Sequence, residues 1–329
     1  MNTLDWQAAT DAVHAAQTIL VVTHMNPDGD AFGSLLGLTN ALRGLGKTVN
    51  CAVDDGLTSE SMMFLPGSNT VLEKLNKGTW DLMISVDASD EERTGKVGAY
   101  GRANSAKVIN LDHHPTNTLF GHIHLIDPAA VSASEIIFRW LKTMDYPFST
   151  DVVVPLLTGL VTDTIGFRTN NVTAATLGLA QEMMQYGASL TEITERTLDN
   201  RPYQVVNLWK EALSSVALYE HNVIAATITL DDIKKAGMHE MTDGGLVNFL
   251  IKVNEASIAV VFKATEEGEV SVSIRAKPGF NVADVAFSLG GGGHILAAGA
   301  TIPGPVEEAR KRVIPLLQEA AKRGKLVIA

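Results

Sequence analysis

Short apolar runs alternate with helix-like segments through the first half of the chain. The runs are rich in β-branched residues and are predicted to be strands; they are TILVVTH (18–24), KTVNCAV (47–53), WDLMISVDAS (80–89) and AKVINLDHH (106–114). Apolar residues at helical spacing follow the first run in AFGSLLGLTNALRGLG (31–46), where Gly44 and Gly46 supply a stop. This alternation predicts a doubly wound, mostly parallel sheet of the α/β class.

The pattern changes in the second half of the chain. Three helices are predicted over 132–144, 151–163 and 173–188, and a polar helical stretch, 193–213, has no clear strand. Alternating strands then follow at 222–230, 258–265 and 269–277, and NVADVAFSLGGGGHILAAG (281–299) closes them. We therefore expect three parts: a catalytic domain over 1–190, a helical linker over 191–215, and a smaller α/β domain over 216–329.

Composition limits the class of protein. The chain has 329 residues, 46% of them hydrophobic, which is enough for two cores. The single Cys51 has no partner for an internal disulfide or a thiolate metal site, the N-terminus shows no basic leader, and no apolar run approaches ~18 residues. We expect a cytoplasmic protein without a membrane partner. Its net charge of −11 argues against binding along long nucleic acid.

Acids and imidazoles gather where the first-half strands end. They are His24, Asp28, Asp30, Asp87, Asp112, His113 and His114, and Asp163 ends a helical segment that can return to the same edge. In an open parallel sheet, ligands collect beyond the carboxyl ends of the strands. Taken alone, Asp30 before a helix is more typical of a helix cap, and Asp112 could cap or orient the neighbouring histidines. The recurrence of one chemical set at four places instead favours a shared site.

So many carboxylates at one site would repel one another unless cations neutralise them. Carboxylates with imidazoles and without thiolates favour Mn²⁺ first, then Mg²⁺, with Zn²⁺, Co²⁺ and Fe²⁺ also open. The set exceeds the needs of one ion, so we expect two divalent ions about 3.5–4 Å apart, an arrangement that binds phosphate esters and activates water.

The same residues resemble a known family. HMNPDGDAFGS, SVDAS, LDHH and GLVTDT look like the four motifs of the DHH phosphoesterases, and SIRAK with GGGGHILAAG looks like their DHHA1 domain. Motif order and approximate spacing agree over nearly the whole chain, whose length is similar to that of the bacterial bifunctional oligoribonuclease (nanoRNase) and PAP phosphatase group. One departure is DTIGF (163–167), where many relatives read DTGSF or DTGRF, so the local turn there is open.

The resemblance implies a role for each matching residue. One ion would be held by His24 and Asp28, the other by Asp30, His113 and Asp163, and Asp87 would bridge both. The implied catalytic residues are His114, facing the scissile phosphate, Asp87, and Asp112, which would orient an imidazole. A turn at Pro27 and Gly29 is expected to let the two opening carboxylates point at different ions.

The second domain is expected to hold the substrate in a cleft between the domains. GGGGH (290–294) offers amides unshielded by side chains, although a flexible turn is the plainer interpretation. Arg275 would by default be a surface arginine. The resemblance implies that it and His294, with Gly291, Gly292 and Gly293, bind phosphate or the terminal nucleotide.

These expectations together describe a metal-dependent phosphoesterase. It would hydrolyse very short RNA or linear dinucleotides to nucleoside 5′-monophosphates and remove the 3′-phosphate of adenosine 3′,5′-bisphosphate. A cyclic-dinucleotide phosphodiesterase is the alternative enzyme, while the GGGGH domain disfavours an inorganic pyrophosphatase. A non-catalytic nucleotide sensor is the alternative class, against which no ligand aspartate is missing. A homodimer is left open.

Overall fold

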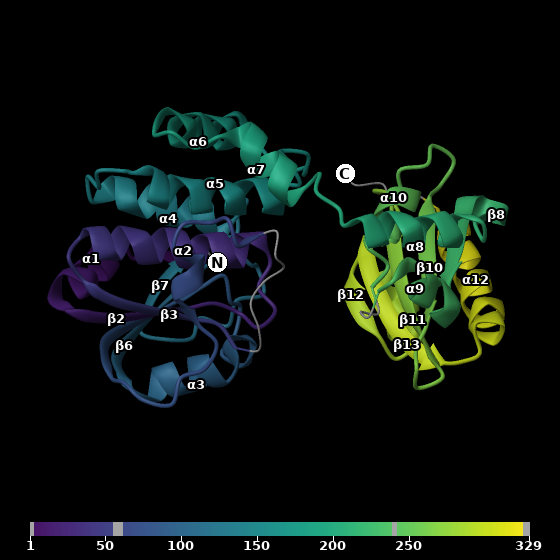
Figure 1. Ribbon diagram of the computed structural model, residues 1–329, viewed down its shortest axis with the longest axis horizontal. Helices are drawn as coiled ribbons and strands as arrows, with labels where there is room; N and C mark the ends of the chain where they lie inside the picture. The colour runs from purple at the N-terminus through teal and green to yellow at the C-terminus, as the bar shows by residue number, and fades with distance from the viewer. Residues whose placement is uncertain (1–2, 55–61, 239–241, 325–329) are drawn as a thin grey trace. The chain divides into compact units, whose positions relative to one another are not determined.

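The computed structural model describes residues 3–54, 62–238 and 242–324 (Figure 1). Contacts divide the chain into two compact units, Met1–Asn200 and Arg201–Ala329. Each unit is an α/β structure, which confirms the predicted fold class. The stretch expected as a linker forms α7 (Leu190–Thr197) in the first unit and α8 (Tyr203–Leu213) in the second. The exact domain boundaries given above stay a prediction.

A doubly wound sheet forms the centre of the first unit. Its strands are β1 (Thr3–Leu4), β2 (Thr18–Val22), β3 (Thr48–Ala52), β4 (Val71–Leu72), β5 (Trp80–Val86), β6 (Ser105–Asp112) and β7 (Ile123–Ile126). Their order is β1-β7-β6-β5-β2-β3-β4, and the pairings are parallel except for β1 with β7. The winding reverses between β2 and β5, and folds of this kind bind ligands beyond the carboxyl ends of such a pair.

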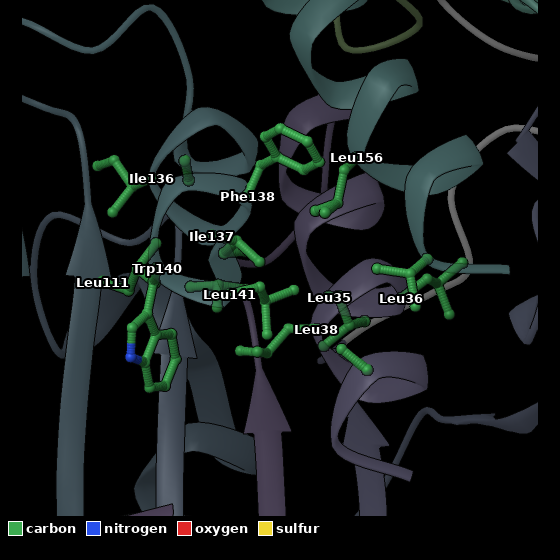
Figure 2. Packing of buried hydrophobic residues seen from close by; sticks show 14 of the residues in the cluster. Leu35, Leu36, Leu38, Leu111, Ile136, Ile137, Phe138, Trp140, Leu141 and Leu156 are labelled. Carbon is green, nitrogen blue, oxygen red and sulfur yellow. The ribbon is translucent and has the colours of Figure 1, made fainter. Parts of the chain in front are cut away.

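Helices cover both faces of this sheet (Figure 1). They are α1 (Trp6–Ala15), α2 (Gly29–Gly44), α3 (Gly95–Ala103) and α4 (Ala133–Thr143). Outside them, α5 (Thr150–Asp163) packs on α2 and α4, and α6 (Ala174–Gln185) packs on α5. On one face Leu35 of α2 and Phe138 of α4 pack with Leu111 of β6 in the main core, seen in Figure 2. On the other face Val97 of α3 packs with Leu20 and Met83. Burying one such side chain contributes about 1.5–3 kcal/mol.

Helices α2 and α5 approach each other closely because glycine faces the contact. A Cβ added at Gly159 of α5 would lie 2.5 Å from Asp30 Oδ1 and 2.1 Å from Ser134 Oγ. Only glycine therefore fits there without displacing the acid. Asp163 lies one helical turn further along α5, so the same close approach brings its carboxylate beside the start of α2.

The second unit is a mixed sheet with helices on both faces. Its strands are β8 (Ala217–Tyr219), β9 (Val223–Ile228), β10 (Ile258–Ala264), β11 (Glu269–Ala276), β12 (Gly292–His294) and β13 (Ala297–Pro303), in the order β12-β13-β11-β10-β9-β8. One core cluster joins the sheet to α8, α9 (Leu230–Ala236) and α10 (Leu246–Leu250). The other joins it to α11 (Ala283–Ser288) and α12 (Val306–Lys322). Among the described residues, no helix is both long and apolar enough to cross a bilayer.

Candidate metal centre

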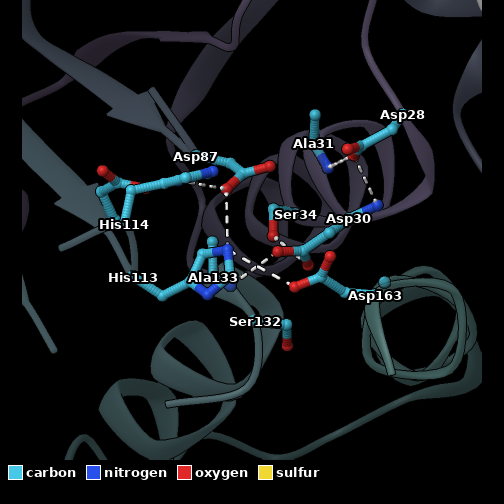
Figure 3. A network of polar contacts seen from close by, with 12 residues as sticks. Asp28, Asp30, Ala31, Ser34, Asp87, His113, His114, Ser132, Ala133 and Asp163 are labelled. Carbon is cyan, nitrogen blue, oxygen red and sulfur yellow. Dashed lines mark hydrogen bonds and ion pairs between the residues drawn. The ribbon is translucent and has the colours of Figure 1, made fainter. Parts of the chain in front are cut away.

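The acids and imidazoles predicted from the strand ends meet at the switch point of the first sheet (Figure 3). His24 follows β2, Asp87 follows β5, and His113 and His114 follow β6. Three groups have ligand atoms within 4.8 Å of one another: His24, Asp28 and Asp87; Asp30, His113 and Asp163; and Asp87, His113 and His114. Asp87 and His113 each belong to two of these groups, so the groups form one continuous cluster.

The spacing within the cluster suits an ion better than direct hydrogen bonds. His113 Nε2 lies 3.5 Å from Asp87 Oδ1 and 3.4 Å from Asp163 Oδ2, and His24 Nε2 lies 3.8 Å from Asp87 Oδ2. Hydrogen bonds to oxygen are usually about 2.7–3.2 Å. Atoms that share an ion at about 2.1 Å stand roughly 3 Å apart, so small movements would complete coordination. The donor set therefore fits hard divalent cations.

Asp87 shows the clearest fit to a metal ligand. Its side chain is 3% exposed, and in the described part of the chain its buried Oδ1 accepts no hydrogen bond. This oxygen has His113 Nε2 and His114 Nδ1 at 3.5 and 3.6 Å but no hydrogen bond, so its charge is compensated by nearby cationic groups, a place that a metal ion can take. Its backbone is also left-handed, with φ of 54°, a conformation that costs energy outside glycine and collects at functional sites.

Backbone and carboxylate partners set the imidazole tautomers. His24 Nδ1 lies 2.8 Å from the carbonyl oxygen of Met25, which can only accept, so Nδ1 donates and the Nε2 lone pair is left for a metal. His114 Nδ1 lies 2.7 Å from Asp112 Oδ1. The other Asp112 oxygen accepts from Asn117 Nδ2 at 2.6 Å, so this fully buried acid is held between Asn117 and His114.

Asn117 belongs to the site but was not predicted from the sequence. Besides fixing Asp112, its Oδ1 accepts from the amide of Leu119 at 2.7 Å, and Leu119 has φ of 57°. It stands five residues after Asp112 in LDHHPTN, and an asparagine that bonds its own backbone two residues on is a local turn signal. That signal gives the turn but not the contact with Asp112.

Asp28, and not Asp30, caps α2, which differs from the interpretation of Asp30 as a cap of its own helix. Asp28 is the N-cap of α2 and accepts from the amides of Asp30 and Ala31 at 3.1 and 3.0 Å. Asp30 instead accepts from Ala133 and Ser134 at the start of α4, at 2.6 and 3.1 Å. It thus joins two helix N-termini while facing the cluster.

The chain turn before α2 also differs from the expected turn at Pro27 and Gly29. The left-handed residue is Asn26, with φ of 51°. Gly29 is the first residue of α2, and a Cβ there would lie 2.4 Å from Thr162 Oγ1. Glycine is needed at this position for packing against α5.

The DTIGF departure produces a strained turn directly after Asp163. Ile165, Gly166 and Phe167 have φ of 51°, 70° and 62°. Ile165 is 53% exposed, and a left-handed β-branched residue is a true outlier. Because isoleucine comes before glycine in this turn, the strained backbone falls on Ile165, an exposed residue two positions after the proposed ligand Asp163.

Burial and charge perturb the titration of the cluster. Burial raises the pKa of Asp30 well above its usual value, and burial with the neighbouring carboxylates raises the pKa of Asp163 to about 6. Burial would lower the pKa of His113, but the carboxylates of Asp87, Asp30 and Asp163 overcome it and raise that pKa to about 10. Burial likewise opposes ionisation of Asp87, yet His113 and its neighbours lower the pKa of this acid.

Metal binding should therefore release a proton near pH 8. His113 is protonated in the metal-free protein below about pH 10, and an imidazolium cannot bind a metal, so affinity should rise with pH through this range. Calorimetric titration of Mn²⁺ at pH 8 in Tris and in Hepes should give heats that differ by the ionisation enthalpy of about one proton. His14→Gln, on an exposed histidine of α1, should leave this difference unchanged, whereas His113→Asn should remove it. Equal heats in the two buffers would contradict the assignment.

The residues expected to hold substrate lie on the second unit. Arg275 is on β11, where its Nε donates to Asn248 Oδ1 at 2.9 Å and its Nη1 donates to the carbonyl of Ile274 at 2.9 Å. His294 is exposed at the end of β12. The glycine run is hydrogen-bonded to the chain before it: the Gly290 and Gly291 amides donate to the carbonyls of Phe287 and Ala286, and the run continues into β12.

Comparison with known proteins finds family models and relatives that together match most of the chain. A model of the DHH family, N-terminal domain, matches residues 18–165, and a model of the DHHA1 domain matches residues 220–323. The bifunctional oligoribonuclease and PAP phosphatase NrnA of Thermus thermophilus is 35% identical over 311 residues, 93% of this chain and 90% of that protein. The NrnA protein of Bacillus subtilis is 30% identical over 288 residues, 87% and 89% of the two chains.

A solved structure shares the fold. An exopolyphosphatase-related protein from Bacteroides fragilis matches with a TM-score of 0.87 over 97% of this chain and 95% of that one, at 24% identity. Two family models match in order, and a relative at 35% identity spans about nine-tenths of both proteins. The chain therefore belongs to the DHH family and carries a DHHA1 domain.

Proposed function

We propose that this chain is a metal-dependent phosphoesterase that hydrolyses very short RNA and linear dinucleotides to nucleoside 5′-monophosphates. Removal of the 3′-phosphate of adenosine 3′,5′-bisphosphate is its second activity. The observation that carries the proposal is the cluster of carboxylates and imidazoles around Asp87 at the switch point of the sheet. Two relatives that span most of the chain are described as oligoribonuclease and PAP phosphatase, which supports the substrate class.

Two divalent ions, Mn²⁺ by preference, fit the ligand groups of the cluster. His24 and Asp28 would hold one ion, and Asp30, His113 and Asp163 the other, with Asp87 shared between them. When bound, such a pair supplies an activated water and positive charge beside the phosphoryl oxygens. The protein fixes the ligands beforehand, since Asp28 and Asp30 are held by helix amides and His24 by a carbonyl.

His114 is the residue that would act directly on the phosphate. Asp112 holds its Nδ1 and raises its pKa, which favours the protonated imidazole. Its Nε2 can then donate to a phosphoryl oxygen or to the leaving oxygen as negative charge develops there. Its side chain is 32% exposed, so a substrate can reach it.

The second unit would bind the terminal phosphate or nucleotide. Asn248 and the Ile274 carbonyl hold the guanidinium of Arg275, which leaves its Nη2 donors available for an anion. His294 lies across β13 from Arg275, because Ala297 pairs with both residues. Both side chains therefore project from the same face of the sheet.

A substrate comparison tests this proposal. Initial rates with added Mn²⁺ should be substantial on pApA and on adenosine bisphosphate, low on cyclic di-AMP, and abolished by a chelator. Faster turnover of cyclic di-AMP than of pApA would favour the cyclic-dinucleotide phosphodiesterase. Tight binding of these compounds without turnover of any of them would favour the nucleotide sensor.

A further inference from the structure

The second sheet carries a shallow hollow of about 470 Å³ beside the Arg275 and His294 pair. Its lining combines three hydroxyl side chains with glycines and backbone: Ser271, Ser273, Thr301, Gly290, Gly291 and Gly299, with Val272 and Ala300. The hollow is wide open to solvent, so it can cover only one side of a small ligand. None of the residues expected from the sequence to bind substrate has an aliphatic hydroxyl, so this lining adds a different chemistry.

Strand register places the hollow on the same sheet face as the proposed phosphate contacts. Arg275, Ala297 and His294 form one row across β11, β13 and β12, and Ser273, Gly299 and Gly292 form the next row. The third row pairs Ser271 with Thr301. Alternate residues of a strand share a face, and two residues span about 6.8 Å, so the third row lies about 13–14 Å from the first.

The middle row explains why the surface is hollow there. Two of its three positions are glycine, so side chains rise from Ser273 alone in that row. A Cβ added at Gly299 would lie 2.9 Å from the Val272 carbonyl oxygen, which shows how closely the backbones approach. The buried partners Val272, Ile274 and Ala300 point to the opposite face, into the core with α11 and α12.

The three hydroxyls of the hollow are available to a ligand. Ser271 and Ser273 are half-buried and Thr301 is exposed. Within the described ranges of the chain, no other side chain or backbone group makes a hydrogen bond with any of them. Each hydroxyl can both donate and accept, as a ribose 2′-hydroxyl can.

We propose that this hollow is a nucleoside subsite that recognises the ribose hydroxyls of a nucleotide whose 5′-phosphate lies on the Arg275 and His294 row. This deepens the proposed function, since it would let the second unit distinguish a ribonucleotide from a deoxynucleotide. The ligand is a nucleoside 5′-monophosphate or the terminal nucleotide of short RNA. Among the described residues none that lines the hollow is charged, although Lys263 pairs with Ser271 at the edge of the third row. We assign the phosphate to the first row, where Arg275 and His294 are the proposed anion contacts, and the sugar to the second and third rows.

Equilibrium binding tests the subsite without using turnover. Full-length protein in excess chelator, which removes ions from the metal cluster, is titrated calorimetrically with AMP and with 2′-deoxy-AMP. AMP should bind more tightly, and the double variant Ser273→Ala with Thr301→Val should lose about tenfold of its AMP affinity, since it removes two hydrogen-bonding hydroxyls. Its affinity for 2′-deoxy-AMP should change less.

A variant that fills the hollow and a matched control variant extend the binding test. Ser273→Leu occupies the hollow and should weaken both nucleotides by about tenfold or more. Ser214→Leu, on an exposed serine at the end of α8, should leave both affinities at the wild-type value. Wild-type protein that binds the two nucleotides equally, or a Ser273→Leu variant that retains AMP affinity, would overturn the subsite.

Kinetics on pApA then separate this inference from the proposed function. The Ser273→Leu variant should raise KM and leave kcat and Mn²⁺ content unchanged, because the metal ligands lie on the first unit. Failure of wild-type protein to hydrolyse pApA would count against the proposed function while the binding result still decides the subsite.

Discussion

Replacing Asp87 by asparagine should abolish turnover of every phosphoester substrate, by more than about a hundredfold, because loss of a mere outer partner of a metal ligand already costs about 10–100-fold. Asp87 is the acid shared between the ligand groups, and its buried Oδ1 has no hydrogen-bond partner in the described residues. Asparagine keeps the shape and removes the charge. It also tolerates the left-handed backbone at this position, so the fold should survive.

Elemental analysis and circular dichroism should accompany these rates. The Asp87→Asn protein should lose bound Mn²⁺ and keep a cooperative melt. Asp145→Asn is the matched control, because Asp145 is exposed and also has a left-handed backbone, with φ of 50°, outside every ligand group of the described chain. It should retain wild-type rates. If Asp87→Asn keeps more than a tenth of wild-type activity, Asp87 does not hold the ions.

The elements that could be predicted are those whose pattern is local. The strands β2, β3, β5 and β6 each contain a short apolar run rich in β-branched residues, and Gly44 and Gly46 mark the end of α2, so the doubly wound fold follows from the sequence. The two-residue strands β1 and β4 are too short to show a period. They form because neighbouring strands offer them backbone partners.

The residues of the candidate site also separate into those that a local pattern predicts and those that depend on tertiary packing. Residues at strand ends, such as His24 and Asp87, could be placed because the topology itself gathers them at one edge. The bond from Asp30 to the start of α4 joins residues 103 apart in sequence, and that from Asn248 to Arg275 spans 27 residues. Contacts of this kind depend on tertiary packing, and no periodicity or local motif reports them.

Catalytic efficiency should fall by more than about tenfold as RNA grows from two to 24 nucleotides, a factor that corresponds to 1.4 kcal/mol of unfavourable interaction. The proposed anion contacts beyond the metal cluster are Arg275 and His294 on the second unit. The chain carries a net charge of −11, so further phosphates meet a surface that is acidic on balance. Repulsion between exposed charges reaches about 10 Å at 0.1 M ionic strength and further in dilute salt.

The dependence of catalytic efficiency on salt shows whether charge repulsion or steric exclusion disfavours the long RNA. Rates on pApA and on a 24-nucleotide RNA with the same terminal dinucleotide should be compared at about 0.01 M and 0.1 M ionic strength, between which the screening length falls from about 30 to 10 Å. The ratio of the two efficiencies should be larger at the lower ionic strength, because each added phosphate is then less screened. A protein that binds along RNA through cations would show the opposite trend, with long RNA favoured as salt is removed. Equal efficiency on both substrates would therefore require a basic surface that follows the strand, and the assignment to short substrates would have to be abandoned.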